Sequence, residues 1–277
     1  MTMDIHKFYD EYTQQVAARP GYPTRAAWKS LVCWRHLVIP HLAEIGDLLR
    51  VADVGGCYGF SANAFVFHGQ RVLNHSITAD VYELAEQYTQ VGQLLFPWIN
   101  FENTDFRAVS LDAPYDVTLM FDVLEHLPDP GAMLAAAVGK SRFLLIKTPL
   151  ETTEKQLARI AAGLEEPIPA GTAHRDGHLH FFTLKSFFDL LNQHWEMVDY
   201  VIPPPSWTPL DLIAPEFVAL TKPKFIFTWQ GVLRFLIDAL PKRFYEALYI
   251  RRVIAGATGG NAFILARPKK HNGTTMR

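Results

Sequence analysis

Short apolar runs alternate with segments of helical periodicity along most of the chain. Residues 48–54 form the first apolar run, and similar runs recur at residues 71–76, 98–103, 115–121 and 141–148. Each run has the length of a buried strand, and the segments between them place apolar residues at helical spacing. Strands that alternate with helices are typical of a mostly parallel sheet covered on both faces. The pattern predicts a doubly wound α/β fold.

The first apolar run ends in a glycine-rich turn. Residues 55–59 read Gly-Gly-Cys-Tyr-Gly, and residues 61–67 predict a helix for which Gly69 is the stop signal. Glycines let the backbone approach a ligand, and the amino end of the helix offers free N–H groups. Asp53, at the end of the strand, is expected to place a carboxylate at the pocket rim. This order of strand, glycine turn and helix predicts a nucleotide pocket, although a lone glycine turn is often only structural.

The most specific signal lies at residues 115–130. An apolar strand leads into Asp122, followed by Leu-Glu-His-Leu and Pro-Asp-Pro. Together with the spacing Asp53-x-Gly55-x-x-x-Gly59, this segment resembles the class I S-adenosylmethionine-dependent methyltransferases, in the subgroup that acts on small molecules and lipid precursors. The resemblance covers residues 50–149. It implies a seven-stranded Rossmann-like sheet, with an antiparallel last strand, and S-adenosylmethionine as cofactor.

The resemblance also implies cofactor contacts. The family has an acidic residue on the ribose at the end of its second strand, where residues 71–76 would place Ser76, with Asp80 one helical turn further on as a substitute. Ser76, and Cys57 at a position often occupied by glycine, predict weakened cofactor binding. Asp105 and Phe106 match the residues that contact adenine. The expected cofactor-binding set is Asp53, Gly55, Gly56, Gly59, Ser76, Ile77, Asp105, Phe106 and Phe121.

Two histidines are candidate catalytic residues for methyl transfer to an oxygen or, as a weaker alternative, a nitrogen. A hydroxyl acceptor gains from a general base, and histidine suits neutral pH. His126, after the fourth strand, is the first candidate, and His178 is the second, with bracing of its loop as the alternative role. Glu125 is expected to pair with backbone or a helix end. The spacing from His178 to His180 suggests a metal only weakly, so no metal is assigned.

Composition narrows the possible partners. The net charge is −2, so no overall field attracts nucleic acid. The two cysteines fit a reducing compartment, and residues 1–17 do not resemble a signal peptide. No apolar run reaches the roughly 20 residues of a membrane-spanning helix. These features predict a cytoplasmic protein whose partner is a small-molecule acceptor. They leave its oligomeric state open.

The chain is expected to divide around the methyltransferase core. An unusually long connection precedes the last strand and should fold, because long structureless loops are uncommon. Phe225 and Trp229 belong to its apolar helical stripe, which would cover the acceptor site or, less plausibly, contact a membrane surface. The predicted segments are an N-terminal helical cap (1–49), the core (50–202), a helical insertion or lid (203–260), the last strand (261–268) and a disordered tail (269–277).

Two alternatives to methyl transfer stay open at this point. One is a non-catalytic methyltransferase-like subunit that binds a partner through residues 203–260, as Ser76 and Cys57 suggest. The other is an enzyme of the same fold that uses the cofactor for different chemistry. The acceptor itself is open among a glycan, a natural product and a lipid or quinone precursor, with a bulky and partly apolar molecule favoured by the aromatic insertion.

Overall fold

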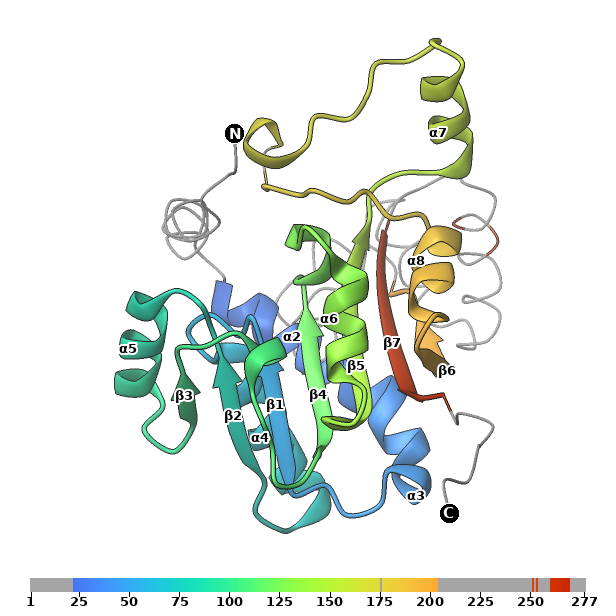
Figure 1. The fold of residues 1–277 in the computed structure, drawn as a ribbon. Helices are drawn as coiled ribbons and strands as arrows, with labels where there is room; N and C mark the ends of the chain where they lie inside the picture. The colour runs from blue at the N-terminus through green and yellow to red at the C-terminus, as the bar shows by residue number, and fades with distance from the viewer. Residues whose placement is uncertain (1–21, 175, 204–250, 252, 254–259, 270–277) are drawn as a thin grey trace, which may run out of the picture.

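A single seven-stranded sheet forms the centre of the computed structural model, in the order β3-β2-β1-β4-β5-β7-β6 (Figure 1). This architecture confirms the predicted doubly wound α/β fold. The structure describes residues 22–174, 176–203, 251, 253 and 260–269.

The strands run parallel except at one position. β7 is antiparallel to both of its neighbours, β5 and β6, and the other strand pairs are parallel. The strands are β1 (Arg50–Val54), β2 (Thr78–Tyr82), β3 (Asn100–Glu102), β4 (Tyr115–Phe121), β5 (Ser141–Leu150), β6 (Trp195–Val201) and β7 (Gly260–Pro268).

Helices cover both faces of the sheet and bury two apolar clusters (Figure 1). One face packs against the N-terminal helices and α4, with Trp34 and Phe65 between the layers. The other packs against α6 and α8, with Leu134 and Phe187. The helices are α2 (Tyr22–Cys33), α3 (Leu42–Ile45), α4 (Phe60–Leu73), α5 (Glu86–Leu95), α6 (Pro130–Ala137), α7 (Glu154–Ala161) and α8 (Leu184–Leu191), with a π-helical segment (Trp34–Val38) and a 3₁₀ turn (Ile39–His41) between α2 and α3.

The predicted second strand at residues 71–76 is wrong, and the reason is Gly69. This glycine does not stop the helix, because α4 continues to Leu73. A Cβ atom at Gly69 would lie 2.4 Å from both Ile77 and the Trp34 ring, so the glycine is required for close packing. The apolar residues after it complete the helix. The true second strand, β2, begins only at Thr78.

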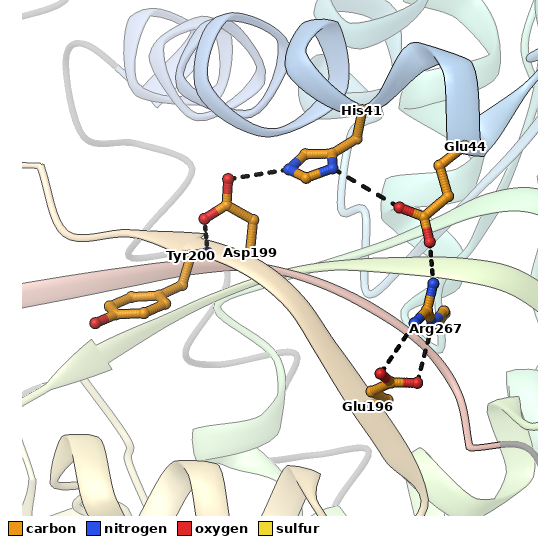
Figure 2. A network of polar contacts seen from close by, with 6 residues as sticks. All are labelled: His41, Glu44, Glu196, Asp199, Tyr200 and Arg267. Carbon is orange, nitrogen blue, oxygen red and sulfur yellow. Dashed lines mark hydrogen bonds and ion pairs between the residues drawn. The ribbon is translucent and has the colours of Figure 1, made fainter.

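A polar network ties the N-terminal helices to the far edge of the sheet (Figure 2). His41 Nε2 lies 3.0 Å from Asp199 Oδ2 on β6. Arg267 on β7 pairs with Glu44 on α3 and, at 2.9 Å, with Glu196 on β6. These contacts fix the helical segments that follow α2 in the chain. One face of α2 borders the cavity described below.

Most of the predicted lid lies outside the described residues, as do residues 1–21 of the predicted cap and residues 270–277 of the predicted tail. The division into these segments stays a prediction. The points where the lid would leave and rejoin the sheet are described. Gly260 pairs with Leu150 at the carboxyl end of β5, and Val201 ends β6 nearby. Within the described part of the chain, no helix is long and apolar enough to cross a membrane.

Candidate active site

A cavity of about 430 Å³ opens at the carboxyl ends of β1, β2, β4 and β5. The strand order reverses beside β1, which lies between β2 and β4. Ligands of doubly wound sheets bind at such a point. The charged and polar residues that line the cavity are Arg25, Lys29, Glu83, Thr104, Asp105, Arg107, Asp122, His126, Lys147, Glu151, Asp176, His178 and Asn261.

The glycine turn after β1 forms one wall of the cavity. Gly55 has a φ of 65°, and a Cβ atom there would approach Val123 to 3.0 Å. Gly55 lines the cavity, whereas Gly56 and Gly59, two further members of the predicted cofactor set, do not. A side chain at Gly56 would meet Asp53 and Val81 at 2.8 Å. Gly55 therefore brings backbone to the ligand, and Gly56 lets the turn pack on the strands.

Asp53 supports the turn from below and does not reach the cavity rim. Its carboxylate is 1% exposed and accepts a hydrogen bond from Ala62 N in the first turn of α4. Burial raises its pKa to about 7, although the Lys29 ammonium opposes the shift. The expectation that Asp53 places a carboxylate at the pocket rim is therefore wrong, because the strand points this side chain beneath the glycines.

Glu83 is the carboxylate that sequence reasoning missed at the end of β2. It is buried and lines the cavity. Its two oxygens accept hydrogen bonds from Cys57 N and Ala85 N, each at 3.0 Å. Ser76 is exposed and Ile77 is buried in the core, and both precede the amino end of β2. The true strand register therefore places Glu83, not Ser76, where the ribose is expected.

Asp105 and Phe106 line the cavity after β3, and Phe121 lines it at the end of β4. Phe106 is buried against Tyr82, with ring centroids 5.1 Å apart. Asp105 pairs with Arg107 at 2.6 Å, which holds the pKa of Asp105 below its usual value. These three predicted cofactor-binding residues all line the cavity, and the Arg107 guanidinium beside Asp105 is an addition that the sequence did not reveal.

Asp122 lines the cavity between the half that contains Asp105 and the half that contains His126 and His178. It has a φ of 59°, a strained value for a residue other than glycine. Its carboxylate pairs with Lys147 and, at 2.6 Å, with Lys29. Burial alone would raise its pKa, but the two ammonium groups hold the pKa below its usual value. Asp122 is therefore ionised and fixed between α2 and β5.

Two histidines and Glu151 line the other half, and Glu125 is buried beside the two histidines. Glu125 and His126 belong to a 3₁₀ turn after β4, and the carbonyl of Glu125 accepts hydrogen bonds from Leu179 N and His180 N. These bonds place His178 against His126, with ring centroids 4.7 Å apart. His178 Nδ1 pairs with the Glu151 carboxylate. The two predicted catalytic histidines thus meet, and Glu151 is a residue that the sequence did not indicate.

The electrostatics of this cluster follow from its burial. Burial lowers the pKa of His126 to about 4, and the neighbouring His178 contributes, so His126 is neutral at pH 7. Burial also raises the pKa of Glu125 well above its usual value, and the charge of Asp122 raises it further. Glu125 was expected to pair with backbone or a helix end. A hydrogen bond from its own backbone opposes this pKa shift, which agrees with the expected backbone contact. Its carboxylate also accepts a hydrogen bond from the Thr148 hydroxyl on β5, at 3.4 Å.

Residues 52–139 match the family of methyltransferase domains. Two ubiquinone biosynthesis O-methyltransferases, from Rhodopseudomonas palustris strains BisA53 and BisB18, are each 29% identical over 133 residues. The match covers 46% of this chain and 51% of each relative, so the chain spans about half the length of the curated relatives it matches.

Solved structures share the fold at low sequence identity. The [4+2]-cyclase SpnF has a TM-score of 0.53 and 13% identity over 95% of both chains. Magnesium protoporphyrin IX methyltransferase from Synechocystis PCC 6803, solved with bound SAH, has a TM-score of 0.52 and 12% identity, over 96% of this chain and 98% of that one. The match of residues 52–139 and the strand order of the seven-stranded sheet both agree with the class I S-adenosylmethionine-dependent methyltransferase fold that the sequence motifs predicted.

The cavity residues fit the cofactor of this family, S-adenosylmethionine. Gly55 leaves a cradle that a Cβ atom would narrow. The Glu83 oxygens keep lone pairs for two hydroxyl groups after accepting one N–H each. Phe106 and Phe121 supply apolar surface for a base. We therefore replace Ser76 and Ile77 by Glu83 in the proposed cofactor set.

Proposed function

We propose that this chain transfers the methyl group of S-adenosylmethionine to an oxygen of a small acceptor. The observation that supports this most directly is the Glu151–His178 pair beside His126, on the wall of the cofactor cavity. The names of the two curated relatives also favour oxygen over nitrogen. The cofactor, when bound, supplies an electrophilic methyl group.

The residues of the chain have two tasks in this proposal. Gly55, Glu83 and Phe106 hold the cofactor, so that the acceptor oxygen can approach in line with the methyl group. His126 and His178 border the acceptor, and His178 takes up its hydroxyl proton, because the pKa of His126, lowered to about 4, makes His126 a weak base. The Glu151 carboxylate fixes the His178 ring with its Nδ1–H outward, which leaves Nε2 as the proton acceptor.

Acceptor class is the finer part of the proposal. The relatives' names point to an oxygen on a quinone precursor, within the bulky and partly apolar class that the sequence favours. Glycans and natural products are the competing classes. Phe225 and Trp229 of the predicted lid would cover this acceptor, and the described ends of the lid are compatible with that placement.

A transfer assay tests the proposal. The full chain is incubated with methyl-labelled S-adenosylmethionine and a panel of hydroxylated aromatics, sugars and hydroxy fatty acyl compounds. Label transferred to an oxygen, and lost in His178→Asn, is the expected result. Binding of S-adenosylhomocysteine without transfer to any class would contradict the acceptor assignment.

The fold of SpnF, a [4+2]-cyclase, keeps non-methylating chemistry as the second candidate. Ser76 and Cys57 suggested a non-catalytic subunit. Ser76 no longer supports that alternative, because Glu83 supplies the carboxylate that Ser76 lacks. Calorimetry with S-adenosylmethionine and S-adenosylhomocysteine separates the non-catalytic subunit from the two enzymes, and the transfer assay separates the two enzymes from each other. A chain that binds neither would be a non-catalytic subunit.

A further inference from the structure

Three neighbouring buried side chains, two of which line the acceptor end of the cavity, form a set of potential metal ligands. Glu125, His126 and His178 are 0%, 7% and 6% exposed. One ligand atom of each lies within 4.8 Å of the others. Two imidazole nitrogens and one carboxylate oxygen are a donor set typical of zinc, iron, manganese and cobalt sites that keep open positions.

The carboxylate of Glu125 is a second and independent observation. Its Oε1 atom is buried and has no hydrogen-bond donor among the residues that the structure describes. A buried carboxylate oxygen without a donor is costly unless a ligand satisfies it. A bound cation would remove this penalty.

Glu151 is placed to orient one of the metal ligands, His178, without binding the ion itself. It binds His178 Nδ1, so Nε2 is the nitrogen that His178 can offer. Ligating histidines usually donate their other ring N–H to a carboxylate or carbonyl in this way. A second group, of Glu151, His174 and His178, is possible by distance. We prefer the first, because Glu151 is exposed and already engaged with the ring.

The backbone holds this arrangement together before any ligand arrives. Leu179 N and His180 N donate to the Glu125 carbonyl at 2.8 and 3.1 Å, and Gly171 N donates to the His178 carbonyl at 2.8 Å. Ligands of one ion lie about 3 Å apart when each bond is about 2.1 Å long. Small side-chain rotations would bring the three atoms to that distance.

We propose that Glu125, His126 and His178 bind one divalent transition-metal ion at the acceptor end of the cavity. His126 and His178 line the cavity, so the open positions of the ion face the acceptor. The role of the ion rests on the proposed function: it would bind the acceptor hydroxyl and make it more acidic. With the ion bound, His178 Nε2 is a ligand and no longer takes up the proton. The hydroxyl proton then leaves to water, the O–CH₃ bond forms, and the electron pair of the broken S–CH₃ bond stays on sulfur.

Cobalt binding tests the site directly. The full chain, without a histidine tag, is stripped with a chelator, exchanged into chelator-free buffer and titrated with Co²⁺. The expected result is one Co²⁺ per chain with visible absorption bands. Glu125→Gln and His126→Asn should weaken binding at least tenfold, and Glu151→Gln tenfold or more, as for outer partners of metal ligands. His68→Asn, a histidine of α4 away from the cavity, is the matched control and should bind as the wild type does.

The other possible outcomes test the position of the ion, its catalytic role and the proposed function. If His174→Asn loses Co²⁺ and Glu125→Gln keeps it, the ion lies on the other side of His178 and the proposed site is wrong. If the wild type binds S-adenosylhomocysteine but no Co²⁺, there is no metal site. Equal methyl transfer by metal-free and Co²⁺-loaded protein would overturn the catalytic role. Co²⁺ binding in a chain that transfers no methyl group would support the site and contradict the proposed function.

Discussion

Two buried glutamates, Glu83 in the cavity wall and Glu125 beside the cavity-lining His126, have very different surroundings. Both oxygens of Glu83 accept backbone N–H groups, from Cys57 and Ala85. Glu125 meets one hydroxyl at 3.4 Å and faces the charge of Asp122. Burial raises the pKa of both carboxyls, but the backbone N–H groups oppose the shift in Glu83, whereas Asp122 adds to it in Glu125.

The difference separates a preorganised half from a half that needs a ligand. The backbone holds Glu83 in one geometry whether or not a ligand is bound, which suits recognition of a cofactor common to a whole family. Glu125 and its histidines are close together but incompletely satisfied, which suits a group that a ligand or ion completes. Substitutions on the two sides should therefore affect different measurements.

The largest effect is expected on the acceptor side. His178→Asn removes the ring that Glu151 orients and should lower kcat by roughly 10²–10⁴-fold, the usual contribution of a positioned base. The affinity for S-adenosylhomocysteine should stay within about twofold, because His178 lies outside the Glu83 half. Steady-state kinetics and calorimetry measure the two quantities.

His180→Asn is the matched control for that prediction. His180 lies two residues away, contacts the Leu127 carbonyl at 2.9 Å and does not line the cavity. Its kcat should change by less than about threefold. A comparable fall in both variants would mean that the loop, and not the His178 ring, matters.

The second prediction concerns the cofactor side. Glu83→Ala removes charge-assisted hydrogen bonds, each worth about 1.5–3 kcal/mol, and should weaken S-adenosylhomocysteine binding roughly 100-fold. Ser76→Ala, at the opposite edge of the sheet, should leave the affinity unchanged. The reverse pattern by calorimetry would restore Ser76 to the ribose position and contradict the strand register of the structure.

Much of the fold could be predicted from the sequence because most strands are apolar and end in clear turns. β2 is the exception. Its central residue, Asp80, is charged and is satisfied by Tyr115 Oη at 2.5 Å, a partner from β4 that no local pattern reveals. The apolar pair before it, Val72 and Leu73, belongs to the last turn of α4. The local pattern therefore favoured the wrong segment.

The residues of the candidate site were also only partly predictable from the sequence. Gly55, Asp105 and Phe106 follow strands directly, so their motif positions were sufficient to place them. Glu83 was missed because its position depends on β2, although a glutamate just after Thr-Ala-Asp-Val-Tyr was a usable signal. The contacts of Glu151 with His178 depend on a loop fixed by tertiary hydrogen bonds. Sequence spacing does not record such contacts.

The third prediction tests the support beneath the glycine turn. Asp53 has a raised pKa of about 7 in the folded chain, so the folded state binds its proton more tightly than the unfolded state does. Its contribution to stability is complete below pH 3.8 and is lost as the pH rises toward about 7. The stability of the wild type relative to Asp53→Asn should therefore fall by about 1.4 kcal/mol per pH unit between about pH 5 and 6.

Urea denaturation of both proteins at a series of pH values measures this difference. Lys29 lowers and Glu83 raises the pKa of Asp53, and both residues remain in the variant. The introduced asparagine side chain keeps an oxygen that can accept the Ala62 N–H. A pH-independent difference would mean that Asp53 is not protonated in this range.

The smallest effect is expected at Asp105, whose carboxylate is neither held by two backbone N–H groups, as Glu83 is, nor poorly satisfied, as Glu125 is. Its carboxylate already binds Arg107 through Nε and Nη2, at 2.6–3.0 Å. An adenine amino group would therefore share the carboxylate with a guanidinium, and Asp105→Ala should cost about 1 kcal/mol, or roughly fivefold in S-adenosylhomocysteine affinity. Arg107→Met frees the carboxylate and should bind as tightly as the wild type or slightly tighter. Unchanged affinity in Asp105→Ala, measured beside this control, would remove Asp105 from the adenine contacts and leave it only as the cap of the turn that begins at Phe106.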